Sequence, residues 1–139
     1  MNREEIKNLL PHREPMLLVD DAVVQEDNSA VGHYTVRGDE WFLQGHFPGN
    51  PVVPGVVLCE MMGQTCCVLL ADQIVGKTPY FTGIDKVKFR STVRPGVTLE
   101  MHCRILRSLR SFFVTECKAF VNGKLCVSGD LSFALVEEE

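Results

Sequence analysis

The sequence predicts an α+β fold in which a curved antiparallel β-sheet wraps around one long buried α-helix. Residues 56–71 form a run of sixteen residues with a single charge, at Glu60, and with apolar residues on every side. Such a run is typical of a buried helix. Several other segments alternate between apolar and polar residues, which is typical of strands with one buried face. One helix covering the apolar face of one sheet satisfies both patterns.

Four elements are expected before the long helix. They are a short helix over residues 2–9, strands over residues 16–25 and 29–37, and one helical turn over residues 39–43. Asp27-Asn28 lies between the two strands and is typical of a hairpin. Leu10–Pro15 contains two prolines and is expected to be a stiff connector.

The long helix is expected to occupy about residues 54–75 and to stop near Gly76, and only strands are expected after it. These strands cover residues 80–84, 86–93, 97–105, 112–121 and 125–135. Pro95-Gly96 and Asn122-Gly123 are turn sequences between them. Residues 1–139 are therefore expected to form a single domain.

Composition narrows the functional class. The chain has 139 residues, is 45% hydrophobic and carries a net charge of −4, which argues against general affinity for nucleic acid. No stretch is expected to act as a signal peptide or to span a membrane, so a cytoplasmic protein is expected. The six cysteines include no CxxC pair and are expected to be reduced, structural thiols. The four histidines are too scattered for a metal motif, and neither a metal nor another cofactor is expected.

A loop rich in proline and glycine leads into the long helix. Residues 45–55 contain three prolines and three glycines, a composition that suits neither a helix nor a central strand. Pro54-Gly55 stands where the helix should begin, and proline is tolerated in the first turn. A rigid loop that carries His46 is thus expected to feed a buried helix that carries Glu60.

This arrangement supplies the parts of an acid–base site. Burial should raise the pKa of Glu60, which could then act as a general acid, and Gln64 lies on the same helical face and could orient it. Histidine is the commonest general base, which points to His46. The free amides of Gly55 and Val56 at the helix start could hold a carbonyl oxygen that gains negative charge. Together these groups could remove a proton next to a carbonyl and expel a β-hydroxyl.

Simpler interpretations exist for both titratable residues. His46 could be a loop histidine whose ring is satisfied by the backbone. Glu60 could be at the edge of the helix and reach solvent. The residues at helical spacing around Glu60 form no charged face, which favours a functional role for it.

The motif from His46 to Gln64 resembles the active-site motif of the 3-hydroxyacyl-acyl-carrier-protein dehydratases of the FabZ type. Leu10–Asp20 and Gly83–Gly96 resemble the flanking signatures of the same family. The resemblance implies a hotdog fold, a homodimer whose two sheets join, and usually a trimer of dimers. It also implies that His46 of one subunit faces Glu60 of the partner subunit.

The resemblance implies dehydration of (3R)-hydroxyacyl-acyl-carrier-protein to the trans-2-enoyl product in bacterial type II fatty acid synthesis. Glutamate at position 60, where the related dehydratase-isomerase type carries aspartate, favours dehydration without isomerisation. Met61–Gly63 replaces a more usual alanine-rich triplet, which leaves the chain-length preference open. The resemblance also places Phe47 and Tyr80 at the acyl-binding site, with Tyr80 as a gate, although Tyr80 could equally be a core aromatic.

Two alternative functions are compatible with such a fold. One is an acyl thioesterase or an enoyl hydratase, which would place its carboxylates differently. The other is a non-catalytic acyl-binding module, which predicts the loss of His46 or Glu60, and both are present.

A positive patch is expected on this acidic chain. Nine of the fourteen Lys and Arg residues fall between residues 86 and 124. Alternation over residues 86–93 places Phe89 toward the core and Lys88 and Arg90 toward solvent, with Arg94 in the following turn. The family's partner is the strongly acidic acyl carrier protein, which such a patch could steer. A solvated sheet face is the simpler interpretation for any one of these residues.

Overall fold

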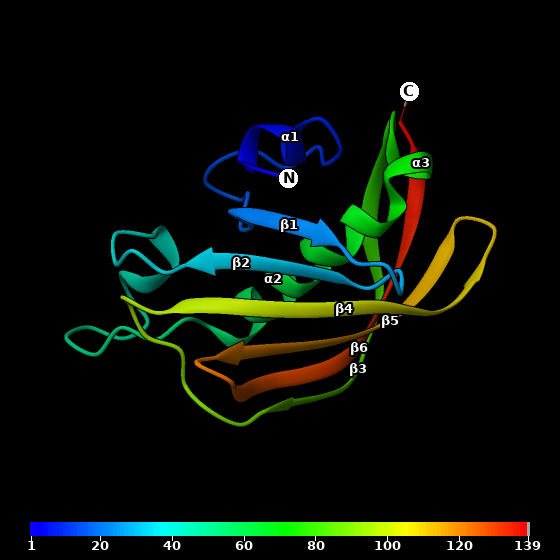
Figure 1. Cartoon of the computed structure of the whole chain (residues 1–139). Coiled ribbons are helices and arrows are strands. Elements are labelled where there is room, and N and C mark those ends of the chain that lie inside the picture. The colour runs from blue at the N-terminus through cyan, green and yellow to red at the C-terminus, as the bar shows by residue number, and fades with distance from the viewer. Residues whose placement is uncertain (139) are drawn as a thin grey trace.

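One six-stranded antiparallel sheet curls around a long helix in the computed structural model, which describes residues 1–138 (Figure 1). The strands are β1 (Asp21–Val24), β2 (Ala30–Thr35), β3 (Lys77–Phe89), β4 (Thr98–Leu109), β5 (Phe112–Val121) and β6 (Lys124–Glu137). They lie in the order β1-β2-β4-β5-β6-β3. The curved sheet around one helix is the hotdog fold, as the sequence predicts.

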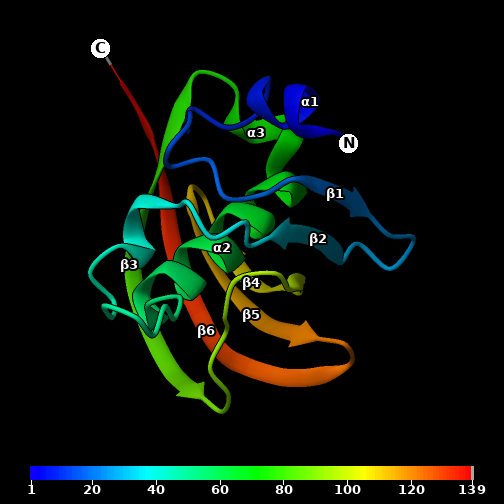
Figure 2. The same cartoon turned by 90° about the vertical axis from the view of Figure 1, so that its left-hand side faces the viewer.

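The long helical segment is confirmed, but it is not one regular helix. It consists of α2 (Gly55–Cys67), a 3-10 turn (Val68–Leu70) and α3 (Ala71–Ile74). Figure 2 shows this segment inside the curl of the sheet. No stretch was expected to span a membrane, but residues 55–74 are long and apolar enough to do so by length and composition alone. Within the fold, 61% of the most apolar window of this segment is buried. The segment is the core of this domain.

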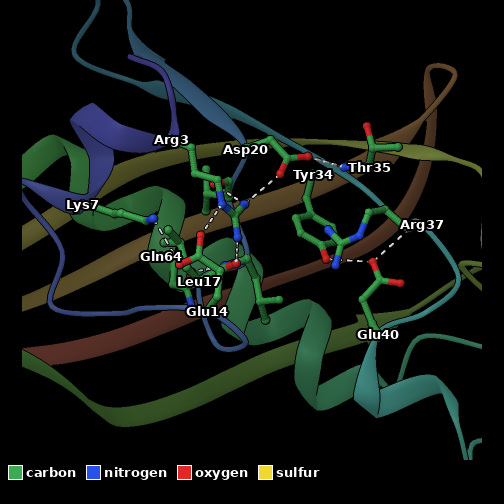
Figure 3. Close-up of polar contacts among 12 residues, drawn as sticks. Arg3, Lys7, Glu14, Leu17, Asp20, Tyr34, Thr35, Arg37, Glu40 and Gln64 are labelled. Atoms are coloured by element: carbon green, nitrogen blue, oxygen red, sulfur yellow. Dashed lines mark hydrogen bonds and ion pairs between the residues drawn. The ribbon is translucent and has the colours of Figure 1, made fainter.

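The first predicted strand is much shorter than expected. The helix α1 (Arg3–Lys7) and the strand β1 are present, but residues 16–20 are not a strand. The backbone there forms hydrogen bonds with side chains instead of with a neighbouring strand. The Gln64 side chain accepts a hydrogen bond from the amide of Leu18 and donates one to the carbonyl of Met16. The Arg3 guanidinium bonds the carbonyl of Leu17 and the carboxylate of Asp20 (Figure 3). The segment is therefore held against the long helix rather than within the sheet.

The edge strand β3 differs most from the prediction. One strand of thirteen residues replaces the two expected ones, with register shifts at Phe81/Gly83 and Asp85/Lys88. Such irregularities change which residues face the core. Phe89, predicted to be in the core, is 56% exposed in the single chain. Tyr80 lies within this strand, as predicted.

The strands β4, β5 and β6 follow their predicted alternation. In β4 the side chains of Leu99, Met101 and Cys103 are buried against the helix. The turn between β5 and β6 is Asn122-Gly123, and both residues have positive φ, at 49° and 78°. Those angles fit the tight hairpin turn that asparagine-glycine favours. At the other end of this hairpin, Phe113 and Phe133 stack with ring centroids 5.8 Å apart.

Candidate active site

The loop before α2 fixes His46 in one orientation. The Nδ1 atom of His46 lies 2.8 Å from the carbonyl oxygen of Val52, and the amide of Val52 donates back to the carbonyl of His46 at 2.8 Å. A carbonyl only accepts, so Nδ1 carries the hydrogen and Nε2 of the neutral ring has a free lone pair. Phe47 stacks on the imidazole with centroids 4.1 Å apart. The backbone satisfies one ring nitrogen and leaves the other available as a base.

The start of α2 lies beside His46 and lines the same cavity. The amides of Val57 and Leu58 both donate to the carbonyl of Pro54, at 3.0 and 3.2 Å. Within residues 1–138 this leaves the amides of Gly55 and Val56 without an acceptor in the protein. These groups and His46 line a cavity of about 590 Å³.

Glycine at the helix start allows close packing of an aromatic ring. A Cβ atom at Gly55 would lie 2.7 Å from the ring of Phe89. Because real Cβ contacts are not that short, only glycine lets the Phe89 ring cover the first turn of the helix. A Cβ atom at Gly63 would likewise lie 2.7 Å from the ring of Phe81.

Glu60 is held by two neighbours on the other side of the helix. Its Oε2 atom accepts a hydrogen bond from Gln64 Nε2 at 2.8 Å. His12 Nε2 lies 3.4 Å from the same oxygen. The predicted pairing of Glu60 with Gln64 is therefore present, and the contact with His12 is new.

The prediction of a raised pKa for Glu60 is wrong. Burial raises the pKa of this carboxyl, but the hydrogen bonds from His12 and Gln64 outweigh it and hold the pKa below its ordinary value. The side chain is also 25% exposed, so its desolvation is incomplete. Glu60 is consequently a carboxylate near neutral pH.

His46 and Glu60 line different cavities of the chain. Glu60 faces a small cavity of about 40 Å³, which it shares with His12, Gln64, Tyr80 and others, but not with His46. A cavity of that size has room for water and not for an acyl thioester. The single chain therefore has two separate cavities, one with the histidine and the helix start and one with the glutamate.

The other predicted site residues lie around these two cavities. Tyr80 is 51% exposed, and its hydroxyl donates to Glu138 at 2.8 Å. Lys88, Arg90 and Arg94 are all exposed. Arg90 lines the His46 cavity, and Arg94 donates to Asn50 in the loop that follows His46. Two residues of the basic patch, Arg90 and Arg94, thus lie beside the cavity that His46 lines.

His12 was considered only as one of four histidines too scattered for a metal motif, and its contact with Glu60 was not predicted. A histidine placed between two prolines in a stiff connector was the available signal. The six cysteines are free and buried, as predicted for structural thiols. The sulfurs of Cys66, Cys103 and Cys117 converge between the helix and the sheet, where burial raises the pKa of the Cys66 thiol. Neutral thiols of this kind pack as small hydrophobic groups.

Comparison with known sequences links this chain to one family. The FabA-like domain family matches residues 10–130. The chain is 42% identical to the 3-hydroxyacyl-[acyl-carrier-protein] dehydratase FabZ of Clostridium perfringens over 137 residues, which cover 97% of this chain and 99% of that protein. It is also 42% identical to the protein of the same name from Clostridioides difficile over 141 residues, which cover 99% of each.

Solved structures support the fold. A chain of the dehydratase heterocomplex ApeI:P from Xenorhabdus doucetiae is similar with a TM-score of 0.83 at 22% identity, covering 96% of this chain and 91% of that chain. The PaaI protein of the E. coli phenylacetic acid degradation operon is similar with a TM-score of 0.64 at 15% identity, covering 82% and 81%.

Proposed function

We propose that His46 and Glu60 carry out the acid–base chemistry of this chain, which belongs to the FabA-like family and is a 3-hydroxyacyl-acyl-carrier-protein dehydratase of the FabZ type. It removes water from a 3-hydroxyacyl thioester in fatty acid synthesis and is therefore a hydro-lyase. We place this reaction in the cytoplasm, on acyl groups carried by acyl carrier protein.

One observation carries the mechanism, namely the shared cavity of His46 and the helix start. The thioester carbonyl accepts hydrogen bonds from the free amides of Gly55 and Val56, which stabilise the negative charge that develops on its oxygen. His46 Nε2 removes the proton from C2, because the bond from Nδ1 to Val52 leaves this nitrogen unprotonated.

Glu60 acts on the leaving hydroxyl as a carboxylate. It accepts a hydrogen bond from the C3 hydroxyl and so orients the oxygen toward the protonated His46. The C3–O bond breaks as His46 returns its proton to that oxygen, so the products are the enoyl thioester and one water molecule, and both residues regain their starting states. The low pKa of Glu60 supports this role over that of a proton donor.

The activity is tested by turnover of 3-hydroxyacyl-carrier substrates of several chain lengths. Appearance of enoyl absorbance without release of free thiol is expected. Release of thiol without enoyl absorbance would identify a thioesterase and reject the mechanism.

A complete site requires two copies of the chain in this proposal. The small glutamate cavity and the separate histidine cavity become one site if a partner subunit brings its His46 to Glu60. The edge strand β3 supports this arrangement, because Phe81, Ile84 and Phe89 on it are 39%, 50% and 56% exposed. Large apolar side chains on a free strand edge favour pairing with a second copy. A trimer of such dimers extends the same proposal.

The basic patch is expected to serve the carrier rather than the chemistry. Reversing Lys88, Arg90 and Arg94 to Glu should lower kcat/KM about tenfold with the carrier-bound substrate, because charge complementarity speeds encounter. The same acyl group on pantetheine or coenzyme A should react at a rate within about twofold of the unmodified enzyme, and the difference in the effect on the carrier-bound substrate should fade with added salt.

The matched control reverses the charges of Arg104 and Arg107, which lie on β4, and of Arg110, which lies in the turn between β4 and β5. Equal losses on both substrates would indicate damage to the site. A loss with the control set alone would move the docking surface to that hairpin.

Tyr80→Ala is expected to raise the apparent KM for long acyl chains several-fold while Tm changes little. The ring is half exposed at the glutamate cavity, so its removal should leave no large void. Tyr80→Phe keeps the ring and should behave like the unmodified enzyme. A Tyr80→Ala enzyme with lower Tm and unchanged kinetics would make Tyr80 a packing residue only.

A further inference from the structure

We propose that His12 is a positioning residue of the dehydration site, which holds Glu60 turned so that its Oε1 atom meets the leaving hydroxyl. This inference rests on the proposed role of Glu60 and adds a third titratable residue to the site. His12 lies on the connector between α1 and β1, far from Glu60 in sequence and 3.4 Å from it in space.

The connector that carries His12 is held by dedicated contacts. The Arg13 guanidinium donates to the carbonyls of Lys7, Leu10 and His12, at 3.1, 2.8 and 2.7 Å. The other end is tied down by the ion pair of Arg3 with Glu14 at 2.9 Å, which Figure 3 shows. The backbone at His12 is thus fixed at both ends, which is what precise placement of its ring requires.

The amide of Gln64 determines which oxygen of Glu60 is free. Its Nε2 atom donates to Met16 O and to Glu60 Oε2, and its Oε1 atom accepts from Leu18 N, all at 2.8 Å. The amide cannot be turned round, because its oxygen would then face the Met16 carbonyl. Glu60 Oε2 must therefore accept, and His12 approaches that same atom. Glu60 Oε1 remains as the oxygen available to substrate.

The ring of His12 has one nitrogen with no partner. Its Nδ1 atom is the one buried side-chain nitrogen or oxygen within residues 1–138 that makes no hydrogen bond. A buried N–H without an acceptor is costlier and rarer than a buried acceptor without a donor. The hydrogen is therefore assigned to Nε2, the ring nitrogen that lies 3.4 Å from Glu60 Oε2.

The neighbouring titratable groups do not interfere with this contact. Burial raises the pKa of the Cys67 and Cys59 thiols, and the hydrogen bond to Glu138 raises the pKa of the Tyr80 hydroxyl. These groups stay neutral in weak acid. The protonation of Glu60 is accordingly controlled by burial, Gln64 and His12.

The test is the titration of Glu60 in the full-length, assembled enzyme, followed by its carboxylate infrared band. The spectrum of Glu60→Gln is subtracted to isolate that band. His12→Phe should move the midpoint up by about one pH unit, because burial remains while a donor is lost. It should also lower kcat about tenfold near pH 8, with KM within about twofold. His12→Gln supplies a neutral donor and should restore both.

His102→Phe is the matched control, since His102 lies on the exposed face of β4, and it should change neither quantity. An unmoved midpoint in His12→Phe overturns the proposal, whatever happens to activity. If that variant does not fold, His12→Ala is judged by the same midpoint. Full activity in Glu60→Gln would instead reject the proposed function, while the midpoint shift would still report the contact with His12.

Discussion

Replacement of His46 by alanine is expected to lower kcat at least about a hundredfold with the fold intact. The ring supplies the base, and no other histidine within residues 1–138 lines its cavity. The loop around it is held by backbone bonds, such as that from the amide of Val53 to the carbonyl of Val93 at 2.8 Å, so removal of the ring should not unfold the site.

The measurement is the rate of enoyl formation, with circular dichroism and Tm as checks on folding. His102→Ala removes an exposed histidine from the sheet and should keep full activity. Ordinary turnover by His46→Ala would remove His46 from the mechanism.

Mixing two inactive variants is expected to restore activity. Glu60→Gln should also lose about a hundredfold in kcat, because an amide is a weaker acceptor for the leaving hydroxyl than a carboxylate. A dimer of one His46→Ala chain and one Glu60→Gln chain would contain one site with both residues intact and one with neither. Random reassembly should therefore recover about a quarter of the unmodified activity.

The two variants are unfolded together, refolded as a mixture and assayed against each variant refolded alone. Recovery in the mixture requires that His46 of one subunit act with Glu60 of the partner subunit. A mixture as inactive as its components would mean that one subunit supplies both residues, which would reject the shared site.

The sequence alone was sufficient for the parts of the fold that depend on local patterns. The apolar run after Pro54-Gly55 predicted the central helix, because burial on all sides leaves no polar face. Strict alternation predicted the buried face of β4, and Asn122-Gly123 predicted a hairpin through its tolerance of positive φ. The loop with His46 and the helix start with Gly55 adjoin in sequence, so their shared cavity was also predictable.

Other features were decided by tertiary structure. β3 became one strand with bulges because its register depends on pairing with β6, and Phe89 is 56% exposed although its ring lies against Gly55, because β3 is an edge strand. The predicted pKa of Glu60 had the wrong direction because sequence shows an apolar environment but not the donors that a carboxylate meets there. Those donors include His12, 48 residues away in the chain, and their arrangement depends on Gln64, which lies 46 residues from its bonding partner Leu18. Contacts at such separations arise only when the helix packs against the connector, so no local pattern encodes them.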